Sequence, residues 1–349
     1  MGVAAAVAAT TTTAVAADRR PRDDGASYAR AVDELTIESE ALRDNPLGDP
    51  YVRPLWVWTP PGHDPDREYT TVYVLQGYTG ELGMWRNRVA FRPTMEELLD
   101  GDAPECLVVF VDASTAYGGS QFVDSAGSGR YATYLCDEVV PFVDSRYRTN
   151  GRRGVAGKSS GGYGAAVTAM LRPDLFQGFA SHAGGGLFEV TIRPFFRVAA
   201  RHLRDRYEGS MERFFEELRG PAPLSSPDDI HVLLQWGFAA AYSADDDGTV
   251  RLPYDIATAE VIPELWERWL EWDYPTLVPR HADALRDLRA IYFDAGRRDE
   301  WFVDFTMEWM RRRLTDLGVR DLHTDLFDAS HAGIEYRYPL GIRYLVDRL

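Results

Sequence analysis

Short apolar runs rich in β-branched residues alternate along the chain with longer segments in which apolar residues recur every three or four positions. Several short runs are apolar on both faces, as in strands of a sheet that helices cover on each side. Predicted strands occupy residues 55–59, 70–77, 106–113, 153–157, 178–183, 290–296 and 323–329, and predicted helices occupy 130–144, 160–171, 301–317 and 334–348. This alternation predicts an α/β fold with a doubly wound, mostly parallel sheet.

The helix predicted over 301–317 has the clearest period. Its apolar face comprises Phe302, Phe305, Trp309, Met310, Leu314 and Leu317. Gly318 follows directly and is expected to end the helix.

Residues 187–285 interrupt the alternation of strands and helices. Four helical patterns lie here, at 194–207, 211–220, 229–242 and 264–274, with polar loops between them. A helix-rich insertion between two core strands predicts a cap over the open end of the sheet.

The first 30 residues are predicted to be a disordered tail, and residues 31–349 are predicted to be one domain that carries the cap. Residues 1–17 are small and mostly apolar, but no basic residue precedes Arg19 and four threonines interrupt the apolar run. A secretory signal normally has a positive start and a continuous apolar centre. We therefore expect a cytoplasmic protein, with secretion through residues 1–17 as the alternative.

Composition limits the partners. The 349 residues are 45% hydrophobic, enough for a large core, and no apolar run approaches the ~18–20 residues of a membrane helix. With 54 acidic against 38 basic residues the formal charge is −16, which argues against nucleic acid or an anionic membrane surface as a partner. The expected partner is a small-molecule substrate, and a homo-oligomer stays open.

Cys106 and Cys136, the two cysteines, are expected to be buried thiols.

The segment "GVAGKSSGGYGAA", residues 154–166, contains the pattern G-x-S-x-G centred on Ser159. It follows a strand-like run and opens a helical one, which is the context that a nucleophile elbow requires. Such a sharp turn leaves no room for side chains two residues on either side of the serine, and glycines occupy both positions. Ser159 is the predicted nucleophile, and a glycine-rich turn with an incidental serine is the alternative.

A serine hydroxyl is a weak nucleophile and needs a base that a third group holds in place. With an elbow of this type the chain order is serine, then acid, then histidine. His331, in a loop after the last predicted strand, is the predicted base. The competing His182 ends the strand that follows Ser159, has no acid at suitable spacing behind it, and is expected to line the pocket instead.

The acid is expected in the loop after the penultimate strand, where the sequence offers Asp294, Asp299 and Glu300. Asp294 falls inside the strand, where a structural role is expected. Asp299 lies beyond the turn at Gly296 and just before a helix, so it can reach across to a histidine. Asp299 is the predicted acid.

Acyl transfer also needs two backbone N–H donors for the oxyanion. Ser160 places one donor at the start of the predicted helix. The other is expected from Tyr78, in the loop after the strand over 70–77.

Six segments together carry a resemblance to a known family: "VYVLQGYTG", "VVFVDAST", "YATYLCDEVVPFVDSRYRT", "GVAGKSSGGYGA", "DAGRRDEWF" and "FDASHAGIEYRY". In this order they resemble the putative-esterase branch of the α/β-hydrolases, which includes esterase D, feruloyl and enterochelin esterases and the mycolyltransferases. The resemblance covers residues 45–186 and 285–349. It implies an α/β-hydrolase fold and a carboxylic-ester hydrolase with Ser159, Asp299 and His331 as its triad. Tyr78 and Ser160 match the oxyanion positions.

The family commonly has histidine or another bulky residue where this chain has Lys158, its single lysine. One interpretation is a short packed turn that merely tolerates lysine. The other is an ammonium group that lines the pocket, where it braces the acid loop or favours anionic substrates.

Tryptophans recur every three residues in the cap, at Trp266, Trp269 and Trp272, and Trp301 lies beside Asp299. Such stripes usually belong to a core. Trp266, Trp269 and Trp301 are also candidates for the wall of an acyl or aryl pocket, because aromatic side chains bury large areas.

The chain is thus expected to be a serine esterase that works through an acyl-enzyme, with no metal and no organic cofactor. Two rivals stay open, namely an acyltransferase with the same triad and a non-catalytic binding protein of the same fold. The sequence predicts an ester substrate without specifying its acyl group or its alcohol.

Overall fold

The computed structural model describes residues 32–60, 62–87, 104–221 and 223–349, so the predicted tail, residues 1–30, lies outside the described residues. Within these ranges eight strands form one sheet, in the order β1-β2-β4-β3-β7-β8-β9-β10. The strands are β1 (Val32–Glu38), β2 (Val52–Trp58), β3 (Tyr69–Leu75), β4 (Cys106–Val111), β7 (Thr149–Lys158), β8 (Gly178–His182), β9 (Ala290–Gly296) and β10 (Leu322–Phe327). Strands β3, β4, β7, β8, β9 and β10 pair in parallel, whereas β1 and β2 add an antiparallel edge.

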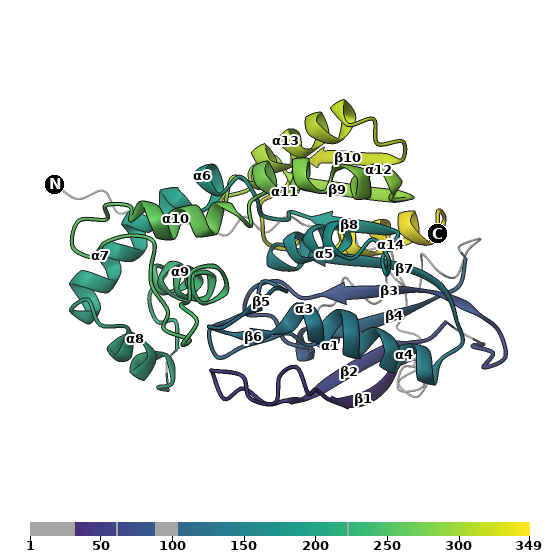
Figure 1. Cartoon of the computed structure of the whole chain (residues 1–349), viewed down its shortest axis with the longest axis horizontal. Helices are drawn as coiled ribbons and strands as arrows, with labels where there is room; N and C mark the ends of the chain where they lie inside the picture. Colours follow the sequence, from purple (N-terminus) through teal and green to yellow (C-terminus); the bar gives the residue numbers. More distant parts are fainter. Residues whose placement is uncertain (1–31, 61, 88–103, 222) are drawn as a thin grey trace, which may run out of the picture.

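The helices either cover the sheet or build the cap (Figure 1). Those of the core are α1 (Gly83–Asn87), α3 (Tyr131–Thr133), the π-helical η2 (Tyr134–Val139), α4 (Val140–Arg146), α5 (Ser160–Leu171), α12 (Ala282–Asp287), α13 (Val303–Asp316), the 3₁₀ turn η4 (Glu335–Arg337) and α14 (Tyr338–Val346). Those of the cap are α6 (Phe188–Thr191), the 3₁₀ turn η3 (Arg193–Phe195), α7 (Phe196–Tyr207), α8 (Met211–Leu218), α9 (Asp229–Tyr242), α10 (Pro263–Leu270) and α11 (Tyr274–Arg280). In the described part of the chain, no helix has the length and apolar character needed to cross a bilayer.

Strand β3 shows why several predicted strands are apolar throughout. Val72 and Val74 pack on one face of the sheet, in a cluster with Ile342 of α14. Tyr73 and Leu75 pack on the other face, in the large cluster that includes α4, α5 and α13. Both faces are therefore covered, which requires apolar residues at successive positions. The doubly wound, mostly parallel sheet is present as predicted.

Some elements differ from those expected. Strand β1 and a small hairpin of β5 (Asp124–Ser125) and β6 (Gly129–Arg130) were not predicted. Strand β1 is an edge strand whose side chains are mostly exposed, so its sequence lacks a strong apolar signal. The helix predicted over 130–144 is divided into α3, η2 and α4.

The apolar face predicted for the helix over 301–317 is partly wrong. Helix α13 begins at Val303, because Phe302 has a left-handed backbone with φ 61°. Phe302 and Phe305 are exposed, whereas Met310 and Leu314 are buried against the sheet as expected. Gly318, with φ 77°, follows the end of the helix as predicted.

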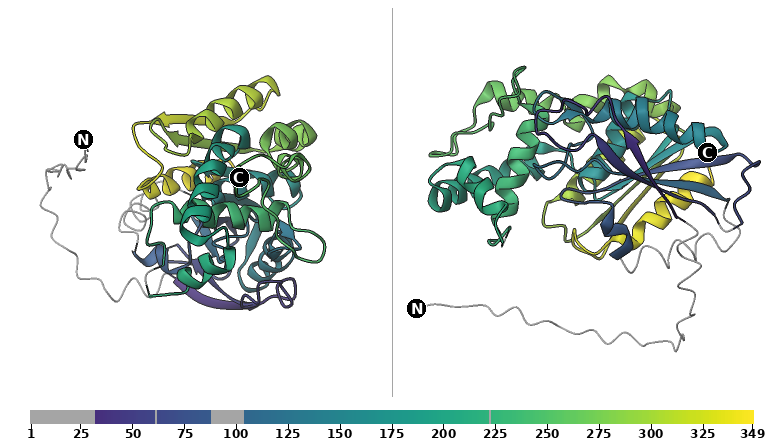
Figure 2. Two further views of the ribbon diagram at one scale, coloured as in Figure 1. Left: turned by 90° about the vertical axis from the view of Figure 1, so that its left-hand side faces the viewer. Right: turned by 90° about the horizontal axis from the view of Figure 1, so that it is seen from below.

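The cap lies between β8 and β9 and extends to one end of the sheet. Figure 1 shows α7, α8, α9 and α10 gathered beyond the strands, and Figure 2 shows the same group from its own side and from below. The segment expected to form the cap, residues 187–285, contains these helices together with α6, α11 and part of α12.

Asp273, the residue before α11, ties the two ends of this insertion together. Its carboxylate accepts the backbone N–H of Phe188, at the start of α6, at 2.8 Å and that of Tyr274 at 2.7 Å. Burial raises the pKa of Asp273 to about 6, although both N–H groups act in the opposite direction. The buried Asp273 carboxyl group thus links the first and last helices of the cap, α6 and α11.

We expect Asp273 to make the free energy of unfolding depend on pH. Its pKa is raised from 3.8 to about 6 in the folded state, so its stabilising contribution is complete below about pH 4 and is lost as the pH rises through 6. A pKa difference of about 2, at about 1.4 kcal/mol per pKa unit, lowers the free energy of unfolding of the wild type relative to Asp273→Asn by on the order of 3 kcal/mol between about pH 4 and pH 7. Urea unfolding of both proteins across this range measures the difference, and a pH-independent difference would contradict the expectation.

Candidate active site

Ser159 stands at the junction of β7 and α5 with a left-handed backbone, φ 57° and ψ −123°. For a residue other than glycine this conformation costs roughly 1–3 kcal/mol and persists only where surrounding contacts fix it. The Ser159 N–H donates to the His182 carbonyl at 2.9 Å, and the Ser159 carbonyl accepts from the Tyr163 N–H at 2.9 Å. The strained turn has the geometry of the predicted nucleophile elbow.

Two glycines make this turn sterically feasible. A Cβ at Gly157 would lie 2.1 Å from the Gly161 carbonyl oxygen. A Cβ at Gly161 would lie 2.3 Å from the carbonyl oxygen of Leu75 on β3. No real Cβ atom approaches backbone so closely, so the G-x-S-x-G spacing follows from the contact between the start of α5 and the sheet.

Asp299 and His331 meet across two neighbouring loops. Asp299 follows β9, and its buried carboxylate lies 2.8 Å from Nδ1 of His331, in the loop after β10. A carboxylate can only accept a hydrogen bond, so the neutral form of the imidazole carries its proton on Nδ1 in this geometry and keeps the lone pair of Nε2. The His331 N–H donates to Glu300 Oε2 at 3.0 Å, which holds the loop from its backbone side.

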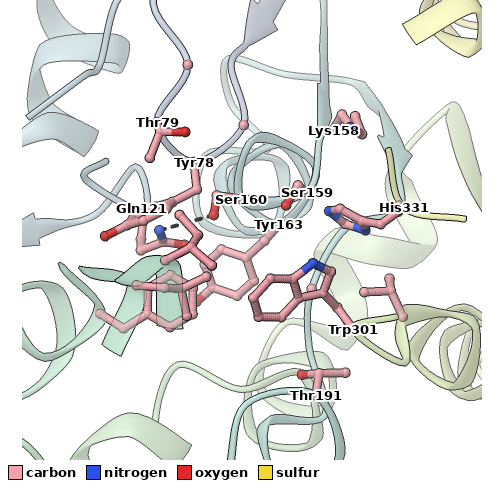
Figure 3. A pocket seen from close by; sticks show the side chains of 18 of the residues that line it. Tyr78, Thr79, Gln121, Lys158, Ser159, Ser160, Tyr163, Thr191, Trp301 and His331 are labelled. Atoms are coloured by element: carbon pink, nitrogen blue, oxygen red, sulfur yellow. Dashed lines mark hydrogen bonds between the residues drawn. The ribbon is translucent and has the colours of Figure 1, made fainter. Parts of the chain in front are cut away.

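Ser159 and His331 line one cavity of ≈ 440 Å³ whose other walls come from the core and the cap. Figure 3 shows the His331 imidazole beside Ser159, with Tyr78 and Gln121 on the other side of the serine. Trp301 also lines this cavity, as predicted. The structure therefore brings the predicted serine, acid and histidine together.

Tyr78 is fixed through its phenol ring. The hydroxyl lies 2.7 Å from the Leu233 carbonyl of α9 and also contacts the Tyr117 carbonyl. A Cβ at Gly118 would come within 2.7 Å of the ring and one at Gly237 within 2.3 Å of the hydroxyl, so both glycines make room for it. Burial raises the pKa of Tyr78 well above its usual value. The loop after β3 is thus anchored on the cap.

Ser160 is the first residue of α5 and is buried beside the nucleophile. Its hydroxyl accepts a hydrogen bond from Gln121 Nε2 at 3.2 Å (Figure 3). The backbone N–H groups in the first turn of a helix have no acceptor within that helix. The Ser160 N–H is therefore presented at the helix start, where the helix dipole also favours negative charge.

Lys158 lines the cavity and forms an ion pair. Its Nζ lies 3.3 Å from Glu335 Oε1, and both side chains are largely buried. Glu335 follows His331 by four residues, whereas Asp299 belongs to the other loop. The ammonium thus braces the segment after the histidine rather than the acid loop.

Over residues 53–316 the sequence matches the protein family described as "Putative esterase". The chain belongs to this family. The resemblance inferred from the motifs is confirmed, and so is the prediction of an esterase, a hydrolase of carboxylic esters.

Solved structures with a similar fold include a ferulic acid esterase, with 18% identity and a TM-score of 0.57 over 91% of this chain and 98% of that chain. An S-formylglutathione hydrolase from Agrobacterium tumefaciens has 16% identity and a TM-score of 0.56 over 91% and 95%. FphF, a fluorophosphonate-binding serine hydrolase from Staphylococcus aureus, has 15% identity and a TM-score of 0.53 over 91% and 97%. At these identities the likeness concerns the fold, and the predicted α/β-hydrolase architecture is confirmed.

The esterase does not use His182 as a pocket residue, so that prediction is wrong. His182 is fully buried away from the cavity, with Nδ1 2.9 Å from Asp294 Oδ1. Arg337 Nε donates to the other Asp294 oxygen at 2.7 Å. Burial alone would raise the pKa of Asp294, but His182 and Arg337 outweigh it and hold that pKa below its usual range. Asp294 has the structural position expected for it.

Trp266 and Trp269 are also absent from the cavity lining, contrary to prediction. Both pack in the apolar core of the cap, where Trp266 Nε1 donates to Glu189 at 2.7 Å and Trp269 Nε1 to Ser243 at 2.8 Å. Helix α10 packs against α9 through Trp269. In this orientation of α10 the tryptophan side chains point away from Ser159.

Gln121 and Glu335 line the cavity but were not predicted. Gln121 belongs to no motif, and its left-handed φ of 55° is a feature of the folded loop alone. Glu335 lies within "SHAGIEYRY", four residues after His331. This closeness in sequence was the one signal that could have indicated a place at the cavity.

We expect Gly161→Ala to prevent the elbow of the esterase from forming, because the new Cβ would meet the Leu75 carbonyl at 2.3 Å. The free energy of unfolding should fall by more than about 4 kcal/mol, or the protein should become insoluble. Gly185→Ala is the matched control, since nothing lies within 4 Å of its Cβ position. Thermal melts followed by circular dichroism compare the two, and a wild-type Tm for Gly161→Ala would contradict the account.

Proposed function

We propose that this esterase hydrolyses its substrate through an acyl-enzyme formed on Ser159. His331 acts as the general base and acid, and Asp299 orients the imidazole and stabilises its charged form. The observation that carries the proposal is the 2.8 Å contact between Asp299 and His331 at the cavity that also holds the strained Ser159.

The first half of the reaction forms the acyl-enzyme. His331 Nε2 takes the proton of the Ser159 hydroxyl while Oγ bonds to the ester carbonyl carbon, and the carbonyl oxygen becomes an oxyanion. When the tetrahedral adduct collapses, the bond to the alcohol oxygen breaks and the imidazolium gives its proton to that oxygen. The alcohol leaves, and Ser159 carries the acyl group.

Water completes the cycle by the same steps. His331 Nε2 takes a proton from the water molecule as its oxygen adds to the acyl carbon. The second adduct expels Ser159 Oγ, which regains its proton from the imidazolium. The products are one carboxylic acid and one alcohol for each ester and water consumed.

The oxyanion is proposed to bind the backbone N–H groups of Tyr78 and Ser160. Two features support these donors, namely the position of Ser160 at the start of α5 and the anchoring of Tyr78 on α9 at 2.7 Å. Donors that are already fixed need no reorganisation when the charge develops, and a single such donor is typically worth 10²–10³-fold in rate.

Ser159→Ala is expected to reduce hydrolysis of p-nitrophenyl acetate by at least about 10³-fold, because no nucleophile remains. Ser145→Ala, at an exposed serine whose hydroxyl donates to the Phe142 carbonyl at 2.7 Å, should retain wild-type turnover. Release of p-nitrophenol at low and high salt measures both variants. Labelling by a fluorophosphonate should disappear with Ser159→Ala alone, and turnover that survives this change would refute the proposal.

The two aspartates near the end of β9 should respond differently to replacement by asparagine. Asp299→Asn should lower kcat by about 10⁴-fold, because asparagine cannot hold the imidazole in the required tautomer. Asp294→Asn should instead lower the free energy of unfolding by about 1–3 kcal/mol, because Arg337 and His182 lose the buried carboxylate that both contact, although Arg337 keeps its ion pair with Asp325. Steady-state kinetics and chemical denaturation of both variants separate the roles, and the reverse assignment would follow if Asp294→Asn were the inactive, stable variant.

A further inference from the structure

The cap contributes an apolar wall to the cavity beside Ser159. Ile230, Leu234, Phe238 and Tyr242 of α9 recur every four residues and so lie along one face of the helix. Phe188 and Ile192 extend this surface, and these six residues are termed the α9 wall. Among the described cap residues that line the cavity, none carries a charge.

The charged part of the lining belongs to the core of the molecule. Lys158 and its partner Glu335 lie at the His331 side of Ser159, and Glu81 comes from the loop after β3. Figure 3 shows Lys158 and Thr191, a cap residue, on opposite sides of Ser159. The cavity therefore has a polar side and an apolar side with the nucleophile between them.

The proposed chemistry assigns one part of the ester to each side. His331 must protonate the leaving oxygen, so the alcohol lies on the His331 side. The carbonyl oxygen is directed to the N–H groups of Tyr78 and Ser160. The acyl substituent takes the remaining direction, which leads to the α9 wall.

Two hydroxyl groups on the acyl side already donate their hydrogens within the protein. The Thr191 hydroxyl donates to the Gly186 carbonyl at 2.8 Å. The Tyr163 hydroxyl donates to the Trp272 carbonyl at 2.8 Å and also interacts with the Tyr242 hydroxyl. The Thr191 and Tyr163 O–H groups are therefore not available as donors, and the α9 wall is otherwise mainly apolar. A polar acyl substituent that faces this wall would lose hydrogen bonds to water, which is costly.

Helix α9 is held in place before any substrate arrives. The Tyr78 hydroxyl lies 2.7 Å from the Leu233 carbonyl, and Phe238 packs edge-on against the Tyr78 ring at 5.9 Å. A pre-formed apolar surface binds an apolar group without the cost of ordering a loop.

These observations lead us to infer that the α9 wall is the acyl subsite, and that it accepts an apolar acyl chain without polar substituents. Leu234, near the middle of the wall, sets the length of chain that fits. The inference rests on the proposed ester hydrolysis at Ser159.

The test measures kcat/KM for p-nitrophenyl acetate, butyrate and octanoate, and for the p-nitrophenyl ester of a hydroxylated aromatic acid. In the wild type, kcat/KM should rise by about fourfold for each methylene that the α9 wall buries. Leu234→Trp should lower the octanoate-to-acetate ratio of kcat/KM by more than about tenfold. Leu234→Ala should shift the preference toward longer chains.

Leu203→Ala is the matched control for these variants. Leu203 is buried in α7 within the core of the cap but does not line the cavity. Its truncation should lower stability as Leu234→Ala does and leave the octanoate-to-acetate ratio unchanged. A shift of the ratio with Leu203→Ala would show that general loosening of the cap, not the α9 wall, sets the preference.

An octanoate-to-acetate ratio that stays at the wild-type value in Leu234→Trp and Leu234→Ala would overturn the acyl subsite. If Leu234→Trp does not fold, Leu234→Ala alone decides the question in the same way. Faster turnover of the hydroxylated aromatic ester than of octanoate would overturn the proposed acyl class. Acetate hydrolysis that depends on Ser159 would leave the proposed function intact in each of these cases, whereas its absence would remove both.

Discussion

The N-terminus of α5 presses directly on the backbone of the sheet, and the rest of the active site depends on this contact. Gly161 faces the Leu75 carbonyl of β3, and a Cβ at Gly162 would lie 2.9 Å from the Cα of Gly184, just after β8. The helix start is thereby held by several strands at once. This contact stabilises the left-handed backbone of Ser159 and presents the N–H groups of the first helical turn to the cavity.

Asp299 and His331 lie together near Ser159 because the sheet places β9 and β10 side by side and in parallel. The loops that leave their carboxyl ends are joined by backbone bonds, from Arg297 N–H to the Phe327 carbonyl at 2.8 Å and from Arg298 N–H to the Ala329 carbonyl at 3.0 Å. Asp299 and His331 therefore come from two loops that hydrogen bonds hold against each other. Parallel strands commonly bring functional residues together at this edge.

The cap is attached to the catalytic core by buried polar contacts as well as by apolar packing. Asp273 joins its two ends, the Tyr163 hydroxyl binds the Trp272 carbonyl, and the Tyr78 hydroxyl lies against α9. Tyr163 also belongs to α5, one turn after Ser159. The insertion that shapes the cavity is thus fixed to the same helix and loop that surround Ser159.

The sequence alone determined the elements whose causes are local. The bounds of α5, α9 and β9 were predicted in full, because the glycine-flanked turn marks the start of α5 and because continuous apolar runs between polar segments delimit α9 and β9. The order of the segments also led to the choice of Asp299 and His331, and the structure places these two residues together. Tertiary structure decided that His182 is a core residue paired with Asp294, that Trp266 and Trp269 turn into the cap, and that Gln121 and Glu335 reach the cavity. The side that a side chain faces depends on the rotation of its element against distant segments, and no window of sequence contains those segments.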